Sequence, residues 1–375
     1  MSENSTPTPA AVKSARGKPR RAFAPAARSR CLAEAKYNRR SDAMNLDRIR
    51  SAAAAIALSL AWAGGALAQT APAPQALAQD VWLIAGGFPD KRQPDGNTVV
   101  FEGATGLVVL DTGRHRWQRQ AILDFARARK VRIAAIVNSH WHLDHVSGNP
   151  DLKAAYPDAK VYASDAIDGA LAGFLKDSAV LSREYLKSPG VPEGTAADIR
   201  GDVATIDNGA ALRPDVVVRQ SGILVLAGRK MQVHLAADGP TAGDVWLYAP
   251  ASRIAAVGDL VTLPVPFFDT ACVAGWQSAL AEVEATPFET LVPGHGKPMT
   301  RAEFGHYRIA FDNFVACANS SRDQAECAAG WAKDAGALLE ANGMDPNRAQ
   351  GMAVYYVNQV LRPNGGNSKF CRTRG

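Results

Sequence analysis

The sequence lacks three features that would point to common classes of protein. No glycine-rich loop carries the lysine and the following helix that bind nucleotide phosphates, since the segments at 86–88 and 103–106 lack both. No C-x-x-C pair is present, and none of the five cysteines lies near the histidine-rich segment at 138–150. No internal repeat has the period of a solenoid. The sequence therefore excludes a P-loop site and a repeat architecture, and it argues against a metal held by thiolates.

The chain also lacks an excess of basic over acidic residues outside its first 50 positions. The first 50 residues hold 12 Lys and Arg against 4 Asp and Glu, residues 51–68 hold none of either, and the remainder holds 30 against 32. The net charge of +6 therefore belongs to the start of the chain, and the rest is nearly neutral. We expect no nucleic-acid partner, because a protein that binds nucleic acid carries its basic patch on the folded domain. The oligomeric state stays open.

Residues 44–68 have the pattern of a signal peptide. A short basic start from Met44 precedes the uncharged, alanine-rich stretch 51–63, and Ala66-Leu67-Ala68 forms a small-x-small cleavage site. The stretch is short and weakly hydrophobic for a stable membrane span. We therefore expect cleavage, no stable membrane anchor afterwards, and a periplasmic or secreted protein.

The segments on either side of this signal have compositions of their own. Residues 1–43 are rich in Arg, Pro and Ala, which indicates a disordered leader or a start assigned too early, with Met44 as the true initiator. Residues 69–79, with their Ala, Pro and Gln, are interpreted as a linker.

Cysteine usage fits export. Beyond Cys31 of the leader four cysteines remain, an even number that favours disulfides and allows three pairings. Cys317 and Cys327 flank a polar, turn-like segment, so we expect them to be bonded and Cys272 to pair with Cys371.

The segment 138–150 reads NSHWHLDHVSGNP and holds His140, His142, Asp144 and His145 within six residues. Such closely spaced polar side chains each need a partner, and a metal site supplies a partner for all of them. Imidazole and carboxylate without thiolate suit zinc first, with iron or manganese as lesser options. The alternative is a group of surface or core histidines that bind no metal, and the spacing favours it less.

This cluster is expected on a strand-to-helix turn. A buried-strand pattern at 131–137 precedes it, and a short helical pattern at 151–157 follows it. In extended chain the first two histidines point to one side, whereas the aspartate and third histidine follow as the backbone turns. One pair could serve one metal ion and the next pair a second.

The remaining chain alternates short apolar strands with helices. The pattern predicts a hairpin around Ala104-Thr105 and a helix over 116–129. Residues 165–213 are less regular, and an insert of this kind between core strands could cover a site. Strands resume between 216 and 261, and the tail after Thr300 is mostly helical in pattern.

Several landmarks together resemble the metallo-β-lactamase superfamily, from about residue 81 to residue 300. They are LDTG with Asp111, HWHLDH, GPTAGD, VGDLV with Asp259, and VPGHGKP with His295. The resemblance implies an α/β fold, a four-layer αββα sandwich that holds metals in loops at one end of two facing sheets. We assign 80–300 to this domain and 301–375 to a helical C-terminal extension packed on it.

The resemblance also implies two zinc sites with shared ligands. They are His140 and His142 for the first site, Asp144, His145 and His295 for the second, and Asp259 as the bridge. Asp111 would brace the histidine turn without touching metal. Asp144 would in addition be catalytic, by orienting the nucleophile.

The sequence departs from the family pattern at one place. The family has its third histidine of the first site in H-T-x-G, and here Pro240 stands there in GPTAG. Proline has no ligand atom, whereas catalytic zinc normally has three protein ligands and a water. Asp238, two residues earlier in extended chain, is a possible substitute ligand. His234 is better interpreted as a hydrogen-bonded or solvent-facing strand histidine.

Three functions are consistent with these residues. The first is an exported zinc hydrolase with one or two zinc ions, in which zinc generates hydroxide that attacks a small ester, lactam or related substrate. The second is a metal-binding or sensing module of the same fold that has lost catalysis, which the loss at Pro240 would explain. The third is a diiron redox variant, ranked last because iron members tend to have Glu in place of His142.

Overall fold

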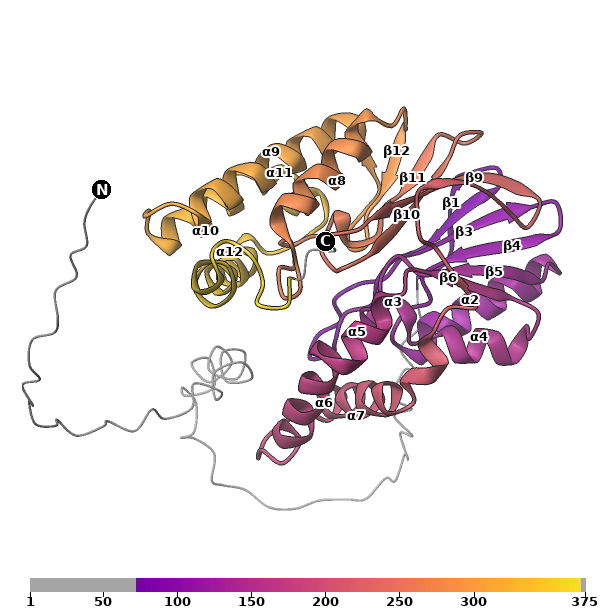
Figure 1. Ribbon diagram of the computed structural model, residues 1–375, viewed down its shortest axis with the longest axis horizontal. Helices are drawn as coiled ribbons and strands as arrows, with labels where there is room; N and C mark the ends of the chain where they lie inside the picture. Colours follow the sequence, from indigo (N-terminus) through magenta and orange to yellow (C-terminus); the bar gives the residue numbers. More distant parts are fainter. Residues whose placement is uncertain (1–71, 372–375) are drawn as a thin grey trace, which may run out of the picture. The chain divides into compact units, whose positions relative to one another are not determined.

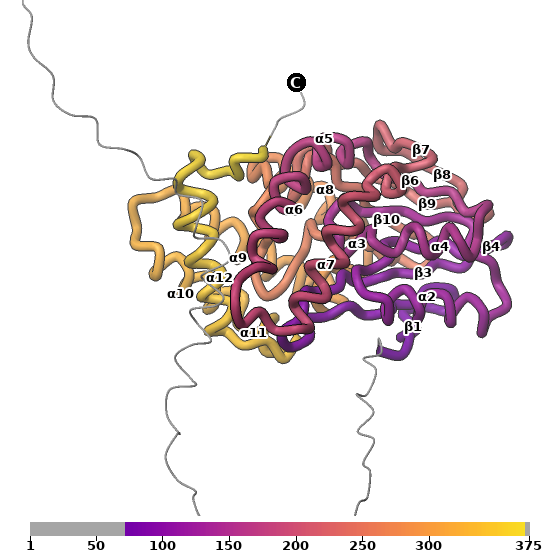
Figure 2. Tube along the Cα trace, turned by 90° about the horizontal axis from the view of Figure 1, so that it is seen from below, coloured from indigo at the N-terminus to yellow at the C-terminus, as the bar shows by residue number. Residues whose placement is uncertain are grey.

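The computed structural model describes residues 72–371, so the expected leader at 1–43 and signal peptide at 44–68 lie outside the described residues. Two β-sheets face each other, and helices cover the outer face of each sheet (Figures 1 and 2). This layer order confirms the expected αββα sandwich. Between residues 72 and 371 no helix combines the length and the apolar character needed to cross a membrane.

The first sheet has seven strands, antiparallel from β1 to β4 and parallel from β4 to β7. They are β1 (Gln75–Ala78), β2 (Val81–Ile84), β3 (Thr98–Gly103), β4 (Gly106–Leu110), β5 (Ile133–Val137), β6 (Lys160–Ala163) and β7 (Val216–Val217). Helices α2 (Arg116–Arg129) and α4 (Asn149–Ala155) cover its outer face. The hairpin of β3 and β4 and the full extent of α2 confirm the sequence predictions.

Burial on both faces explains why the central strands read as continuous apolar runs. In β4, Val108 and Leu110 pack between the two sheets, whereas Leu107 and Val109 pack under the outer helices. The strand therefore needs no polar face, and its loops are free to carry the polar residues of a site.

The second sheet has six strands in the order β13-β12-β11-β10-β9-β8. They are β8 (Gly222–Leu226), β9 (Arg229–Ala236), β10 (Asp244–Ala249), β11 (Ile254–Ala256), β12 (Thr290–Val292) and β13 (Met299–Thr300). The helices on its outer face are α8 (Val273–Ala285), α9 (Arg301–Ala318), α10 (Gln324–Asp334), α11 (Gly336–Ala341) and α12 (Pro346–Tyr355). The tail after residue 300 is helical, as predicted, and shares one hydrophobic cluster with this sheet.

An insert of three helices separates β6 from β7. It consists of α5 (Ala166–Ala172), α6 (Phe174–Tyr185) and α7 (Glu193–Asp207), followed by a short 3-10 turn, Gly209–Leu212. In Figure 1 these helices lie on the opposite side of the molecule from α9 and α10.

The expected linker at 69–79 is wrong in part, because its second half forms the edge strand β1. This strand pairs antiparallel with β2. Leu77 and Ala78 pack against the hydrophobic cluster between the sheets. Main-chain pairing and apolar burial outweigh the linker-like composition, so regular structure begins before residue 80.

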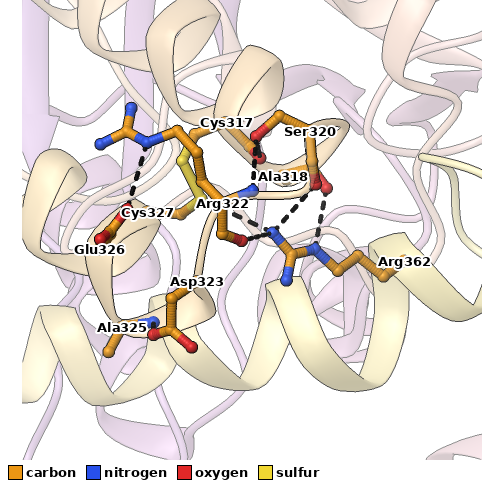
Figure 3. Close-up of a disulfide and its surroundings, with 9 residues drawn as sticks. All are labelled: Cys317, Ala318, Ser320, Arg322, Asp323, Ala325, Glu326, Cys327 and Arg362. Carbon is orange, nitrogen blue, oxygen red and sulfur yellow. Dashed lines mark hydrogen bonds and ion pairs between the residues drawn. A yellow bond between two sulfur atoms is a disulfide. The ribbon is translucent and has the colours of Figure 1, made fainter.

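Both disulfides have the expected pairing. Cys272 is bonded to Cys371, and Cys317 is bonded to Cys327. The second bond joins the end of α9 to α10. The Arg362 guanidinium donates to the carbonyl of Ala318, the last residue of α9, and to those of Ser320 and Arg322 in the following segment (Figure 3). The C-terminal helices are thus fixed to one another at this end.

Candidate metal centre

The histidine turn lies between β5 and α3 (Leu143–Val146) and is braced by Asp111, which directly follows β4. Asp111 has a left-handed backbone conformation, with φ of 62°, which residues other than glycine rarely adopt. Its carboxylate accepts from the Ser139 amide at 2.7 Å, the Ser139 hydroxyl at 2.6 Å and His145 Nδ1 at 2.8 Å. Asp111 therefore occupies the supporting position expected from the sequence.

These bonds decide which ring nitrogen two histidines offer. A carboxylate can only accept, so the Ser139 hydroxyl donates to Asp111 and accepts from His140 Nδ1, which lies 2.9 Å away. His145 donates its Nδ1 proton to Asp111 in the same way. In the neutral rings, Nε2 of His140 and of His145 is then left with its lone pair, as a metal ligand requires.

Five of the six expected ligands converge at one end of the sheets. The structure brings His140, His145 and Asp259 into one group, and Asp144, His145 and His295 into a second, with ligand atoms within 4.8 Å of one another in each. All five side chains are buried. The second group has the residues predicted for the second site, whereas the first group contains His145 and lacks the predicted His142.

The distances within the centre are short and join both sheets. Asp259 Oδ1 lies 3.2 Å from His145 Nε2, and His295 Nε2 lies 3.1 Å from Asp144 Oδ2. His140 Nε2 lies 3.5 Å from Asp259 Oδ2. Asp259 follows β11 and His295 follows β12, so the second sheet supplies these two ligands and the first sheet supplies the others.

Two glycines make this approach possible. A Cβ on Gly96 would lie 2.3 Å from the His145 ring, and a Cβ on Gly294 would lie 2.0 Å from Asp259 Oδ1. Asn97, next to Gly96, donates to the carbonyls of Pro293 and Gly296 and so fixes the loop that carries His295.

The residues present fit a metal ion. His140 Nε2, Asp259 Oδ1 and His295 Nδ1 are buried and make no hydrogen bond within the described residues. Unpaired buried polar atoms are costly, and a cation would satisfy at least the first two, which face the centre. Imidazole and carboxylate donors without thiolate suit zinc.

Electrostatics in the centre favour ionised carboxylates. Burial alone would raise the pKa of Asp144 and of Asp259, but the neighbouring His145 and His295 hold both pKa values below the usual range. Burial alone would lower the pKa of His145, and the three surrounding carboxylates raise it well above its usual value. Burial and the charge of His145 together lower the pKa of His140.

Comparison with known proteins identifies the family. The family model of the metallo-beta-lactamase superfamily matches residues 92–295, more than half of the chain. The chain belongs to this superfamily. The match ends at His295, so the helical tail lies outside it.

Curated relatives cover the chain only in part. An atrochrysone carboxyl ACP thioesterase of Aspergillus fumigatus is 33% identical over 92 residues, which is 24% of this chain and 29% of that protein. A linear primary-alkylsulfatase of Pseudomonas sp. is 23% identical over 231 residues, 54% of this chain and 42% of that protein. The chain thus matches less than half the length of either relative.

Among solved structures, the stereoselective inverting sec-alkylsulfatase Pisa1 from Pseudomonas sp. is similar with a TM-score of 0.54 and 18% identity. The match covers 76% of this chain and 50% of that chain. At this identity the likeness bears on the fold alone.

The sixth expected ligand, His142, lies beside the centre but in neither group. Its Nε2 lies 3.2 Å from Thr270 Oγ1, and the Thr270 hydroxyl donates to the Pro240 carbonyl at 2.7 Å. Because that carbonyl can only accept, the hydroxyl oxygen accepts from His142 Nε2. The Nδ1 atom of His142 is then the nitrogen left to bind metal.

The two residues considered as replacements for the missing histidine lie elsewhere. Asp238 packs against the first turn of α8, since a Cβ on Gly275 would lie 2.7 Å from the Asp238 Cβ. His234 stacks on Trp246 at 3.7 Å, and its Nδ1 lies 2.7 Å from Glu282 Oε1. Within the described residues, neither belongs to a group that could hold a metal.

Arg114 is a site residue that the sequence did not point to. Its guanidinium lies 3.6 Å from Asp144 Oδ1 and pairs with Asp202 of α7. Next to it, His115 lies between Asp95 and Asp198, and Asp198 belongs to α7 as well. From the sequence, the signal for Arg114 and His115 is that they directly follow the LDTG segment. Their partners on α7 lie far away in sequence and could not be foreseen. The insert thus reaches the centre through ion pairs.

Aromatic rings flank the centre on two sides. Phe88 and Phe267 have ring centroids 5.3 and 5.5 Å from that of His295. Trp141 lies 4.6 Å from His142, and Phe174 of α6 lies 6.3 Å from it. Apolar rings therefore lie next to His142 and His295.

Proposed function

We propose that this protein is an exported zinc-dependent hydrolase of small esters or related compounds, with one or two zinc ions per chain. The observation that supports it is the convergence of three imidazoles and two carboxylates, buried and with unpaired ligand atoms. When bound, zinc would lower the pKa of a water molecule and polarise the bond to be cleaved.

The protein's own residues have defined tasks in this proposal. His140, His145, His295, Asp144 and Asp259 would hold the metal, with His142 joining through Nδ1. Asp144, next to the Arg114 guanidinium, is ionised and can accept a hydrogen bond from the nucleophile, which orients it. Arg114 holds Asp144 from the side of the insert.

The substrate class is inferred from the relatives. The names of similar proteins refer to an ACP thioesterase, an alkylsulfatase and a hydroxyacylglutathione hydrolase. These names refer to hydrolysis of thioesters and of sulfate esters. We infer a small thioester, sulfate ester, lactam or carboxylic ester, since function follows the site and not the fold.

Elemental analysis of the purified protein, together with hydrolysis assays on a panel of these substrate classes, tests the proposal. Bound zinc with turnover of any class supports it. Zinc without turnover favours a metal-binding or sensing module, and iron favours the redox variant. Protein that holds no metal, and gains none on addition of zinc, would falsify all three.

The substitution at Pro240 favours the second candidate, a metal-binding member without catalysis. If the missing imidazole weakens the first site, Pro240→His should raise bound zinc toward two per chain and increase hydrolysis. Unchanged stoichiometry with lower activity would mean that other residues already complete that site. Pro240→Ala is the matched control, because it removes the ring without adding a ligand.

Export is proposed from the signal-like segment at 44–68. The mass of the protein recovered outside the cytoplasm tests it, with an expected N-terminus at Gln69. Full-length protein retained in the cytoplasm would contradict export without affecting the metal site.

A further inference from the structure

We propose that Trp141, Phe174 and Phe370 form a binding site for an apolar acyl or alkyl group of the substrate, beside the metal centre. We call these three residues the aromatic trio. The inference rests on the proposed hydrolytic function and adds the substrate class to it, namely esters or thioesters of medium-length apolar acids.

Three distant segments contribute the trio. Trp141 lies between the first two histidines, Phe174 begins α6 of the insert, and Phe370 lies in the C-terminal tail. The ring of Phe174 is 5.5 Å from that of Trp141 and 5.2 Å from that of Phe370, edge-on at 84°. Through Phe174, which is 6.3 Å from His142, the trio adjoins the centre.

The outer members of the trio keep apolar surface in contact with water. Trp141 is buried, whereas Phe174 and Phe370 are only half-buried. Apolar surface left exposed gains nothing in folding, but a ligand that covers it recovers that free energy on binding.

The tail that carries Phe370 is tied down by several bonds. Cys371 is bonded to Cys272 at the start of α8. Ser368 donates its amide to the Ala271 carbonyl at 3.0 Å, and Asn367 accepts from the Val273 amide at 2.8 Å. Chain ends are usually poorly ordered unless tied in this way. Phe370 stays half-buried although these bonds fix the tail. Burial of the Phe370 ring is therefore not what the bonds achieve.

The loop that receives the tail also contacts the metal centre. Ser368 Oγ donates to the Asp269 carbonyl, and the next residue, Thr270, contacts His142. Tyr356 of the C-terminal extension donates to the Asp269 carboxylate at 2.8 Å. The same short segment therefore sets the positions of both Phe370 and His142, and the distance between trio and centre is fixed.

The experiment compares p-nitrophenyl acetate, butyrate and octanoate as substrates of the zinc-loaded protein. In the wild type, kcat/KM should rise by about two- to fourfold for each methylene that reaches the trio. The octanoate-to-acetate ratio should fall about tenfold in Phe370→Ala and in Phe174→Ala. It should stay unchanged in Ile309→Ala, which removes an apolar side chain that is 60% exposed on α9.

Further variants distinguish the effect of the Cys272–Cys371 disulfide from the effect of the Phe370 side chain. The double variant Cys272→Ser/Cys371→Ser should lower the ratio as Phe370→Ala does, whereas Phe370→Leu should keep most of it. Phe174 and Phe370 lie on different elements, so a variant that fails to fold leaves the other as the test. Equal ratios in wild type, Phe370→Ala and Phe174→Ala would overturn the proposal.

A binding measurement keeps this test independent of hydrolysis. If no ester is turned over, the proposed function fails, but calorimetric titration with acetate, hexanoate and decanoate still tests the trio. Affinity should increase with chain length in the wild type and increase much less in Phe370→Ala. The same increase in both proteins would reject the binding site.

Discussion

At the scale of single residues, hydrogen-bond direction determines what each histidine can do. Asp111 accepts from His145 Nδ1, and the Ser139 hydroxyl that donates to Asp111 accepts from His140 Nδ1. Thr270 accepts from His142 Nε2. The first two rings therefore offer Nε2 and the third offers Nδ1. Thr270 takes its position from the Pro240 carbonyl, so the residue that lacks a ligand atom still contributes to the site through its main chain.

We expect Thr270→Val to weaken zinc binding, because the His142 ring loses the acceptor that orients it. Loss of such an outer partner lowers metal affinity by about 10- to 100-fold. Competition with a chromophoric chelator measures the affinity. Thr270→Ser keeps the hydroxyl and should bind zinc nearly as the wild type does. If valine and serine variants bind zinc equally, Thr270 has no positioning role.

Asp244 predicts a dependence of stability on pH. Burial raises the pKa of Asp244 to about 8, although Thr241 donates two hydrogen bonds to it. Its pKa in the unfolded chain is about 3.9, so between pH ~4 and pH ~8 unfolding releases a proton. The stability contribution is complete below the lower value and is lost as pH rises through the higher one.

In Asp244→Asn the free energy of unfolding should therefore fall less steeply as pH rises. The contribution of Asp244 to this slope is at most about 1.4 kcal/mol of unfolding free energy per pH unit between pH ~4 and pH ~8. Urea unfolding of the metal-free protein at pH 5 and pH 7 measures it, with the difference between wild type and variant isolating this carboxyl from other groups. Parallel profiles would show that Asp244 is already ionised at neutral pH in the folded protein.

At the scale of elements, some could be predicted from their own side chains and others could not. Helix α2 could be predicted because its apolar residues Ile122 and Ala126 recur at the helical period and face the sheet. The ligand turn could be predicted because its spacing is specific. The contacts of α7 could not, since Asp198 and Asp202 pair with arginines that lie 106 and 88 positions earlier, Arg92 and Arg114. Thr270 and β1 were missed for the same reason, because tertiary contacts determine both.

The ion pairs of Arg114 with Asp202 and Asp144 predict a coupling between α7 and the metal centre. Asp202→Asn removes the charge of a partly buried partner of Arg114, whose guanidinium also lies 3.6 Å from Asp144 Oδ1. We expect a loss of about 2 kcal/mol in the free energy of unfolding, together with altered zinc affinity. Urea unfolding and zinc competition measure the two effects.

Asp207→Asn is the matched control for this prediction. Asp207 lies in the same helix and pairs with Arg183, but both side chains are about half exposed. An exposed pair contributes roughly 0–1 kcal/mol. If Asp202→Asn changed stability and zinc affinity no more than Asp207→Asn, α7 would not be coupled to the centre.

At the scale of the whole molecule, the centre joins the two sheets. His140 and His145 follow β5 of the first sheet, whereas Asp259 and His295 follow β11 and β12 of the second. A metal bound to these ligands connects the layers at the end where their loops meet. It should therefore stabilise the sandwich as one unit, beyond its effect on the turn itself.

Removal of metal should lower the melting temperature of the whole sandwich in a single transition. At a free zinc concentration 1,000 times the dissociation constant, bound zinc contributes about 4 kcal/mol. For a folded part of about 300 residues that amounts to roughly 6 °C. Calorimetry with and without chelator measures the difference.

Ligand variants show whether this difference comes from the proposed centre. In His145→Ala the melting temperature should no longer respond to chelator, and in His295→Ala it should respond less than in the wild type, because only His145 belongs to both groups. His306→Ala, on the exposed side of α9, should respond as the wild type does. A full response to chelator in both ligand variants would place the stabilising metal elsewhere. Because His145 lies in both groups, its loss should empty the centre completely, whereas loss of His295 leaves the ligands of the other group in place.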